Sequence, residues 1–251
     1  MKLLFLGVSS ALSVGEKQYQ SNMIIETLDG KRMLFDCGSD VKHSLYEQGI
    51  SFPQVDAVYI SHLHADHAGG LEWFGFSKYF LEKKRPSLYI SPDQKDTLWD
   101  HVLSGGMSCL EDFQPTLSTY FDVKNISQNQ FSWENHSFQL IKVQHGISNH
   151  QYLPAYGLLI KGDSKTIFIS SDTRYCPDIL EPIYRRADLI FHDCETSPFK
   201  SEQHPHYEDL KNIDMHIKNK MWLYHYNAGE LPDALKDGFL GFVSRGQTFE
   251  F

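Results

Sequence analysis

The sequence predicts an α/β protein in which two β-sheets pack face to face and helices cover their outer faces. Three observations lead to this fold class. Short apolar runs typical of buried strands recur in both halves of the 251 residues, helix-like stretches stand between them, and no linker rich in proline, glycine or serine divides the halves. The third observation predicts a single domain over residues 1–251.

The first half opens with strand-like runs at residues 2–7, 22–27 and 32–35, followed by an amphipathic helix at 41–48. The mostly apolar run 55–60 predicts a buried strand. Residues 71–80 are predicted to be partly helical, 87–91 to form a strand, and 92–103 to form a helix that Gly105-Gly106 ends. A polar, irregular stretch then leads to a strand at 138–143.

The second half of the chain shows the same alternation of strand-like and helix-like segments. Strands are predicted at residues 156–160, 166–170 and 189–192, with a helix at 177–186 between the last two. A helix at about 207–213 follows, then a buried strand at 222–225. A last strand at 242–251 closes the chain.

Composition indicates a globular protein that does not bind polyanions. Hydrophobic residues make up 41% of the chain and charged residues 22%, and the formal net charge is −9. The one basic cluster, Lys83, Lys84 and Arg85, is short and reads as a solvated turn. We therefore expect no large nucleic-acid partner.

The sequence also predicts a cytoplasmic protein without a membrane partner. No run approaches the ~18 apolar residues of a spanning helix, and the first residues, although they mimic a signal peptide, are read as the first core strand. The spacing of the four cysteines suggests neither a disulfide framework nor a cysteine zinc site, which fits a reducing compartment: Cys37, Cys109, Cys176 and Cys194.

Four ligand-type residues, His62, His64, Asp66 and His67, follow the strand at 55–60 directly. In an extended segment His62 and His64 point to the same side, and a turn at Asp66 can aim Asp66 and His67 at a second point nearby. This spacing predicts two metal ions rather than a polar loop with chance histidines. Imidazole and carboxylate ligands suit Zn²⁺ and also tolerate Mn²⁺ or Fe.

Further ligand-type residues stand at later strand ends. His145 follows the strand at 138–143, Asp172 follows 166–170 and His225 ends 222–225. Because an α/β scaffold presents ligands at strand termini, we expect them at the same site.

These residues carry a family resemblance: the sequence resembles the metallo-β-lactamase-fold hydrolases. The match runs from the opening strand with Gly7 through Phe35-Asp36-Cys37-Gly38, the His-x-His-x-Asp-His signature and Ser171-Asp172-Thr173 to His225. It implies a four-layer αββα sandwich. It also implies that His62, His64 and His145 hold one metal, that Asp66, His67 and His225 hold the other, and that Asp172 bridges them. Such a pair, about 3.5–4 Å apart, lowers the pKa of water and clamps the reacting group.

A second histidine region narrows the resemblance. His204-Pro205-His206-Tyr207, opening a helix, is similar to the helix start that ribonuclease Z and related phosphodiesterases use, where a histidine contacts the phosphate and assists the leaving group. The resemblance places this role on His206, with His204 as the alternative. The alternative to both is a histidine that caps the helix and has no catalytic role. Asp66 is expected to be a catalytic residue as well as a metal ligand. Asp193 is expected to orient a ligand imidazole.

Within this branch the sequence is most similar to the cyclic-nucleotide phosphodiesterases, which include the anti-Pycsar enzymes by which phages destroy cyclic pyrimidine mononucleotide signals. The compact length, the missing tRNA-gripping arm, and the segments 206–210 and 223–226 carry this placement. It implies hydrolysis of cyclic mononucleotides such as cCMP, cUMP, cAMP or cGMP to linear monophosphates, by a homodimer with two divalent ions, Zn²⁺ or Mn²⁺, per chain. Tyr152, Trp73 and Phe74 could stack on the base, or belong to the core.

Three other functions stay open at this point. One is a ribonuclease Z-like nuclease that processes the 3′ end of tRNA, and another is a lactonase or lactamase of the same fold. The third is a module that binds metals and senses a nucleotide without turnover. The complete ligand set, including Asp172, favours an enzyme over the last of these.

Overall fold

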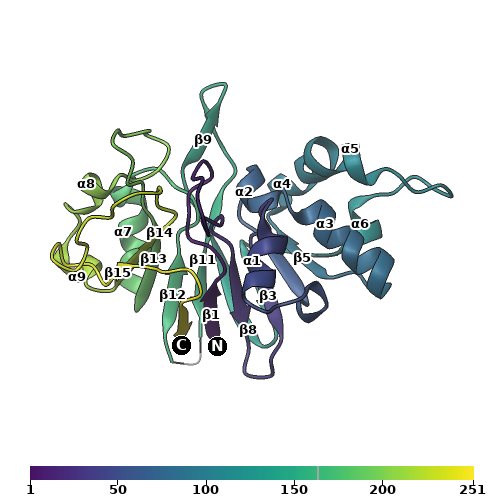
Figure 1. Cartoon of the computed structure of the whole chain (residues 1–251), viewed down its shortest axis with the longest axis horizontal. Coiled ribbons are helices and arrows are strands. Elements are labelled where there is room, and N and C mark those ends of the chain that lie inside the picture. The colour runs from purple at the N-terminus through teal and green to yellow at the C-terminus, as the bar shows by residue number, and fades with distance from the viewer. Residues whose placement is uncertain (163) are drawn as a thin grey trace.

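Two seven-stranded sheets lie at the centre of the molecule, with helices on both outer sides (Figure 1). The computed structural model describes residues 1–162 and 164–251. The first sheet has the strand order β16-β1-β2-β3-β4-β5-β6, and the second has the order β15-β14-β13-β12-β11-β8-β7. The predicted fold class, two sheets between layers of helices, is confirmed.

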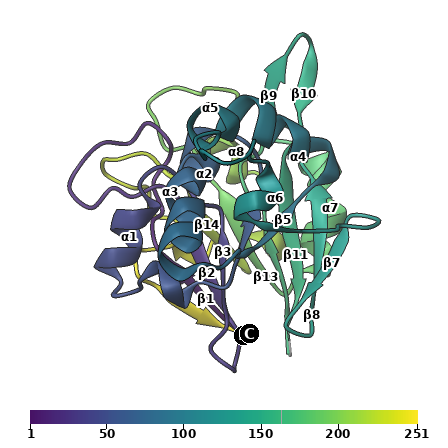
Figure 2. The ribbon, with the colours of Figure 1, turned by 90° about the vertical axis from the view of Figure 1, so that its right-hand side faces the viewer.

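The strands of the first sheet are β1 (Lys2–Phe5), β2 (Met23–Glu26), β3 (Arg32–Phe35), β4 (Ala57–Ile60), β5 (Ser87–Ile90), β6 (Asp122–Lys124) and β16 (Thr248–Glu250). Those of the second sheet are β7 (Gln130–Trp133), β8 (His136–Lys142), β11 (Tyr156–Lys161), β12 (Thr166–Ile169), β13 (Leu189–Asp193), β14 (Met221–Tyr224) and β15 (Gly241–Phe242). A two-stranded hairpin of β9 (His145–Ser148) and β10 (Gln151–Leu153) projects beyond the sheets at the top of Figures 1 and 2.

The helices divide between the two sides of the sandwich. On the right of Figure 1, the side of the first sheet, lie α1 (Val41–Glu47), α2 (Ala65–Ala68), α3 (Leu71–Phe76), α4 (Pro92–Thr97), α5 (Ser104–Met107) and α6 (Leu117–Tyr120). The 3₁₀ helix η1 (Phe52–Gln54) and the π-helical segments η2 (Ser77–Glu82) and η3 (Leu98–Leu103) adjoin them. On the left lie α7 (Pro177–Arg186), α8 (Tyr207–Leu210) and α9 (Met215–Lys218).

Apolar side chains fill the space between the sheets and the space under each helical layer. Phe5 and Tyr59 of the first sheet and Phe138 and Phe191 of the second belong to one buried cluster, which is the contact between the sheets. A second cluster, with Val58 among its members, packs under the helices of the first side, and a third packs under those of the second side. Alternation along β1, where Leu3 and Phe5 are fully buried, is what a strand covered on one face requires.

Parallel pairing brings strand ends of both sheets to one edge. β3, β4 and β5 run parallel in the first sheet, and β12, β13 and β14 run parallel in the second. The carboxyl ends of parallel strands meet on one side of a sheet, and this is the side where α/β proteins bind ligands. The loops that carry the predicted metal ligands all begin there.

The predicted last strand at 242–251 is wrong in one respect, because the segment is two strands in different sheets. β15 pairs with β14 in the second sheet, and β16 pairs with β1 in the first. A turn at 244–247, with Gly246 at a φ of 80°, carries the chain across.

Two further differences concern the middle of the chain. The helix after Pro92 continues through Gly105 and Gly106 to Met107 instead of ending there. The polar stretch before β8 contains α6, β6 and β7, none of which the apolar pattern indicated. In the part of the chain that the structure describes, none of the helices combines the length and the hydropathy needed to cross a bilayer.

Candidate metal centre

The predicted ligands converge at the carboxyl ends of strands from both sheets. His62 and His64 follow β4, whose four residues are all buried, and Asp66 and His67 lie in the short helix α2. His145 begins β9, Asp172 follows β12, and His225 follows β14. These side chains form two overlapping groups with ligand atoms within 4.8 Å of one another, and Asp172 belongs to both.

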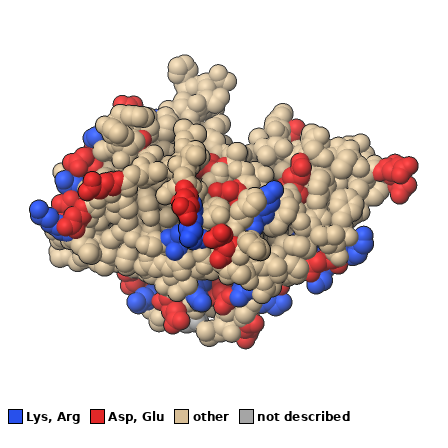
Figure 3. Space-filling view, in the orientation of Figure 1, with Lys and Arg blue, Asp and Glu red and all other residues tan. Residues whose placement is uncertain are grey.

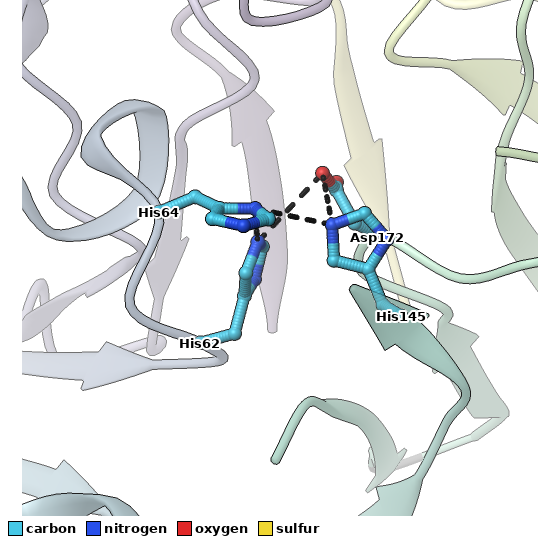
Figure 4. Close-up of side chains that lie close together, drawn as sticks. All are labelled: His62, His64, His145 and Asp172. Carbon is cyan, nitrogen blue, oxygen red and sulfur yellow. Dashed lines mark hydrogen bonds and ion pairs between the residues drawn. The ribbon is translucent and has the colours of Figure 1, made fainter. Parts of the chain in front are cut away.

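The first group consists of His62, His64, His145 and Asp172, which point toward a common centre in Figure 4. Nδ1 of His64 lies 3.0 Å from Nε2 of His62 and 3.1 Å from Nε2 of His145. The Oδ2 atom of Asp172 is 3.8 Å from the His62 nitrogen and 3.7 Å from the His145 nitrogen. His64 is exposed whereas the other three are buried, so the centre meets solvent at His64.

The second group consists of Asp66, His67, Asp172 and His225, and it is buried throughout. Nε2 of His67 lies 3.0 Å from Asp66 Oδ2 and 3.2 Å from Asp172 Oδ2. Nε2 of His225 lies 3.4 Å from the same Asp66 oxygen and 3.4 Å from Asp172 Oδ1. Asp172 therefore presents both carboxylate oxygens to the two groups.

The ligand rings of His67, His145 and His225 each have an acceptor oxygen close to Nδ1. Nδ1 of His67 donates to Asp36 Oδ2 at 2.7 Å, and Nδ1 of His145 donates to the carbonyl of Gln203 at 3.2 Å. Nδ1 of His225 lies 3.3 Å from Asp193 Oδ1. Such outer contacts select the tautomer and leave Nε2 as the ligand atom.

The donor set and its unpartnered atoms fit divalent metal ions. Nε2 of His67 and Oδ1 of Asp172 are buried without a hydrogen-bond partner. Buried polar atoms in that state cost free energy unless something pairs with them. Imidazole nitrogens and carboxylate oxygens arranged around two centres are ligands that Zn²⁺ and Mn²⁺ accept.

The first group is poised to bind a cation. Burial is the main cause that lowers the pKa of His62, His64 and His145, the last to about 4. These rings are therefore neutral near pH 7, as a metal ligand must be.

The second group behaves differently because carboxylates surround its histidines. Burial lowers the pKa of His225, but Asp172 and the contacts with Asp193 and Asp66 outweigh it and raise it to about 10. For His67, burial is likewise outweighed by Asp172, Asp66 and Asp36, which raise its pKa. Without a cation these rings hold protons where an ion would otherwise sit.

His204, the rival in the sequence prediction, lies at the cluster. Its Nδ1 donates to Asp193 Oδ2 at 2.8 Å and is 4.0 Å from Asp172 Oδ2. Its ring packs against those of His145 and His225, with centroids 5.1 and 4.9 Å away. The side chain keeps 21% of its surface exposed.

His206 does not belong to the ligand groups, so the structure places the predicted catalytic histidine outside the cluster and leaves its role a prediction. It is the N-cap of α8, where its Nδ1 accepts from the Glu208 amide at 3.3 Å and its Nε2 donates to the Ser197 carbonyl at 3.0 Å. Both ring nitrogens are thus used by the chain itself. His204 and Asp193 share a ligand group with Asp172 and His225, and His206 does not belong to it.

The aromatic candidates separate clearly. Phe74 is fully buried and Trp73 packs against the same core cluster, so both are core residues. Tyr152, in contrast, is 42% exposed on the hairpin that His145 begins, and the Arg174 guanidinium lies 6.0 Å from its ring centroid. Tyr152 remains a candidate substrate contact.

Sequence reasoning did not single out Asp36 or Arg174. An acidic residue directly after the strand at 32–35 is the signal by which Asp36 could have been found. Asp36 is fully buried and also accepts from the Ser61 amide and hydroxyl, both at 2.8 Å. Arg174 gave no local signal, because its partners Tyr152 and Glu202 are distant in sequence.

Comparison with known proteins agrees with this geometry. A family model described as Anti-Pycsar protein Apyc1 matches residues 1–249. A protein of that name from Paenibacillus harenae is 33% identical over 231 residues, which cover 90% of each chain. Another from Bacillus phage 010DV004 is 29% identical over 259 residues, which cover 99% of this chain and 98% of the phage protein.

Similarity to a solved structure identifies the fold of this chain. The crystal structure of the metallo-beta-lactamase fold protein YhfI from Bacillus subtilis is similar to this chain with a TM-score of 0.74 and 17% sequence identity. The similarity covers 99% of this chain and 98% of that one. The αββα sandwich described above is therefore the metallo-β-lactamase fold.

Proposed function

Because the chain belongs to the anti-Pycsar protein Apyc1 family, we propose that it hydrolyses small cyclic mononucleotides to linear nucleoside monophosphates. It is a metal-dependent hydrolase of the metallo-β-lactamase fold. The observation that carries the proposal is the pair of ligand groups joined by Asp172, with His204 beside them. A two-centre site of this kind suits phosphodiester cleavage.

The proposed ligands of the first ion are His62, His64 and His145, and those of the second are Asp66, His67 and His225. Asp172 is the proposed shared ligand. Two divalent ions, when bound, would polarise the phosphodiester oxygens and lower the pKa of the attacking water. We propose Zn²⁺ as the native ion, with Mn²⁺ as a substitute, because the donors are imidazole and carboxylate without thiolate.

His204 takes the role of general acid in this proposal, in place of His206. Asp193 occupies Nδ1 of His204, so Nε2 is the nitrogen left to face a substrate. Burial lowers the pKa of His204, but Asp193 outweighs it and raises the pKa above its ordinary value. The protonated ring can then donate to a phosphoryl oxygen or to the leaving 3′ oxygen as charge develops there.

Surface charge supports a small substrate. Lysine and arginine alternate with aspartate and glutamate over the face drawn in Figure 3, and no continuous basic surface appears there. A tRNA would require a basic track, which the formal net charge of −9 also disfavours. This argues against the ribonuclease Z alternative.

Several finer statements belong to the same proposal. We propose that residues 1–251 act as one domain, that the protein is a homodimer in the cytoplasm, and that its activity disables a nucleotide signal of phage defence. The cytoplasm is supported by four free cysteines, two of them, Cys37 and Cys194, buried. The homodimer rests on the resemblance described above.

Turnover of a substrate panel tests the function. The protein loaded with Zn²⁺ or Mn²⁺, and a chelated control, would be offered cyclic mononucleotides, cyclic dinucleotides and a 3′-extended tRNA. We expect metal-dependent conversion of the cyclic mononucleotides alone to linear monophosphates. Cleavage of tRNA alone would overturn the proposal in favour of the nuclease, and no turnover with tight nucleotide binding would indicate a sensor.

A further inference from the structure

A pocket of about 200 Å³ opens beside His204. His204 also belongs to a ligand group with Asp172 and His225, so the pocket adjoins the metal centre. Its lining is polar and charged with one aromatic ring, from Arg174, Tyr175, Lys200, Glu202, His204 and Asp209. A volume below the roughly 300–1,000 Å³ of ordinary ligand sites suits one heterocyclic ring rather than a whole dinucleotide.

The charges in this pocket are already paired. Nζ of Lys200 lies 2.5 Å from Asp209 Oδ1, and the Arg174 guanidinium lies 3.7 Å from Glu202 Oε2. These two pairs cancel, and Asp193 balances the His204 ring in the same way, so the pocket offers no net attraction to a second phosphate. It offers instead hydrogen-bond donors next to acceptors, which a neutral polar ring can use.

Three segments of the chain position Arg174 relative to the metal centre. Its own segment begins with Asp172, its amide donates to the Gln144 carbonyl at 2.6 Å, and its guanidinium lies over the Tyr152 ring. Tyr152 is on the hairpin that starts at His145, and Glu202 precedes His204 by two positions. All three segments that meet at Arg174 therefore also supply a side chain to the cluster.

We propose that this pocket is the nucleobase subsite, in which Arg174 and Glu202 contact the polar edge of the base and Tyr175 stacks on its face. The inference rests on the proposed function. Guanidinium donors match the ring nitrogen and carbonyl acceptors of a base, and a carboxylate accepts from an exocyclic amine. The Tyr175 side chain is 40% exposed, which leaves ring surface for stacking.

Kinetics on substrates with and without a base test the proposal. Arg174→Gln and Tyr175→Ala would be compared with the wild type on cyclic CMP and on bis(p-nitrophenyl) phosphate, a diester without a base. We expect each variant to lose at least tenfold more kcat/KM on cyclic CMP than on the base-free diester, mainly through KM. Arg185→Gln is the matched control, because Arg185 also pairs with a glutamate, Glu181, but lies on α7 outside the pocket.

Equal losses on both substrates would overturn the inference, because Arg174 would then only position the ligand segments. Equilibrium titration gives a second readout that needs no turnover. CMP should bind the metal-loaded protein at least tenfold more tightly than ribose 5-phosphate, and Arg174→Gln should reduce that advantage. Equal affinities in the wild type would refute the subsite. If the wild type cleaves no cyclic mononucleotide, the proposed function fails, and the titration still decides whether the pocket binds a base.

Discussion

The carboxylate of Asp36 accepts a hydrogen bond of 2.7 Å from Nδ1 of His67, and this contact leaves Nε2 of the same ring directed at Asp66 and Asp172. Asp36 is thus positioned to fix the tautomer of a buried ligand. Asp36→Asn keeps the shape but removes the charge, so we expect affinity for the second metal ion to fall about 10–100-fold. Metal titration with elemental analysis measures this. Asp29→Asn, in an exposed turn, is the control, and unchanged affinity in D36N would contradict the assignment.

Metal binding should release protons, and mainly at one of the two ligand groups. The pKa of His225 is raised to about 10, so its ring is protonated near pH 7 when no ion is bound, whereas the pKa of His145 is lowered to about 4 and its ring is neutral. A cation must displace the proton of the His225 ring, whereas the His145 ring carries no proton to displace. We therefore expect affinity at the Asp66, His67 and His225 group to rise as pH rises from 6 to 8.

Calorimetry in two buffers of different ionisation enthalpy counts the protons released by each ion. The expected pattern is one binding step with almost no release and one step with release. Two steps with equal release would contradict the difference between the groups.

Substituting His204 or His206 should affect kcat to very different extents. His204→Gln removes the ring that donates to Asp193, and we expect kcat for a cyclic mononucleotide to fall about 10²–10⁴-fold while two ions stay bound. His206→Gln removes the cap of α8 and the hydrogen bond to the Ser197 carbonyl, so it should leave kcat nearly unchanged and cost about 1–2 kcal/mol of unfolding free energy. A larger kcat loss in H206Q than in H204Q would restore the role predicted from sequence.

A hydrogen bond between the sheets should contribute to stability. The buried Tyr59 hydroxyl of the first sheet donates to the Tyr156 carbonyl of the second at 2.9 Å. Tyr59→Phe leaves that carbonyl without this donor, and we expect the free energy of unfolding to fall by about 1–3 kcal/mol. Urea denaturation should show a lower midpoint with an unchanged slope, and Tyr46→Phe, at an 81% exposed position, should show neither.

The candidate metal ligands could be predicted because most of them stand shortly after an apolar run, and Asp66 and His67 follow in the same segment as His62. The chain marks the end of β4 with His62 and of β14 with His225, and both side chains lie where strand termini meet. His204 and His206 could not be distinguished in this way, since they are two positions apart before the same helix. What separates them is the backbone pairing of Glu195 with residues 205–207, which the local sequence pattern does not show.

The missed strands have a related explanation. β6 is only partly buried and short, and it exists because it pairs with β5 at the edge of the first sheet. The sequence predicts β15 and β16 as one strand because each contains a phenylalanine and only a short segment with the turn at Gly246 separates them. Local hydropathy does not indicate which sheet a strand joins, because pairing with distant strands decides the sheet.

The ligands of the second group come from opposite sheets, and Asp66 and His225 are 159 positions apart in the chain. Neither half of the molecule holds a complete set of donors by itself. During folding an ion can find its full coordination only after the two sheets have docked, a late event because contacts so distant in sequence close slowly. Ions bound at this group would therefore stabilise the folded molecule after the sheets have docked, and we expect them to slow its unfolding without speeding its folding.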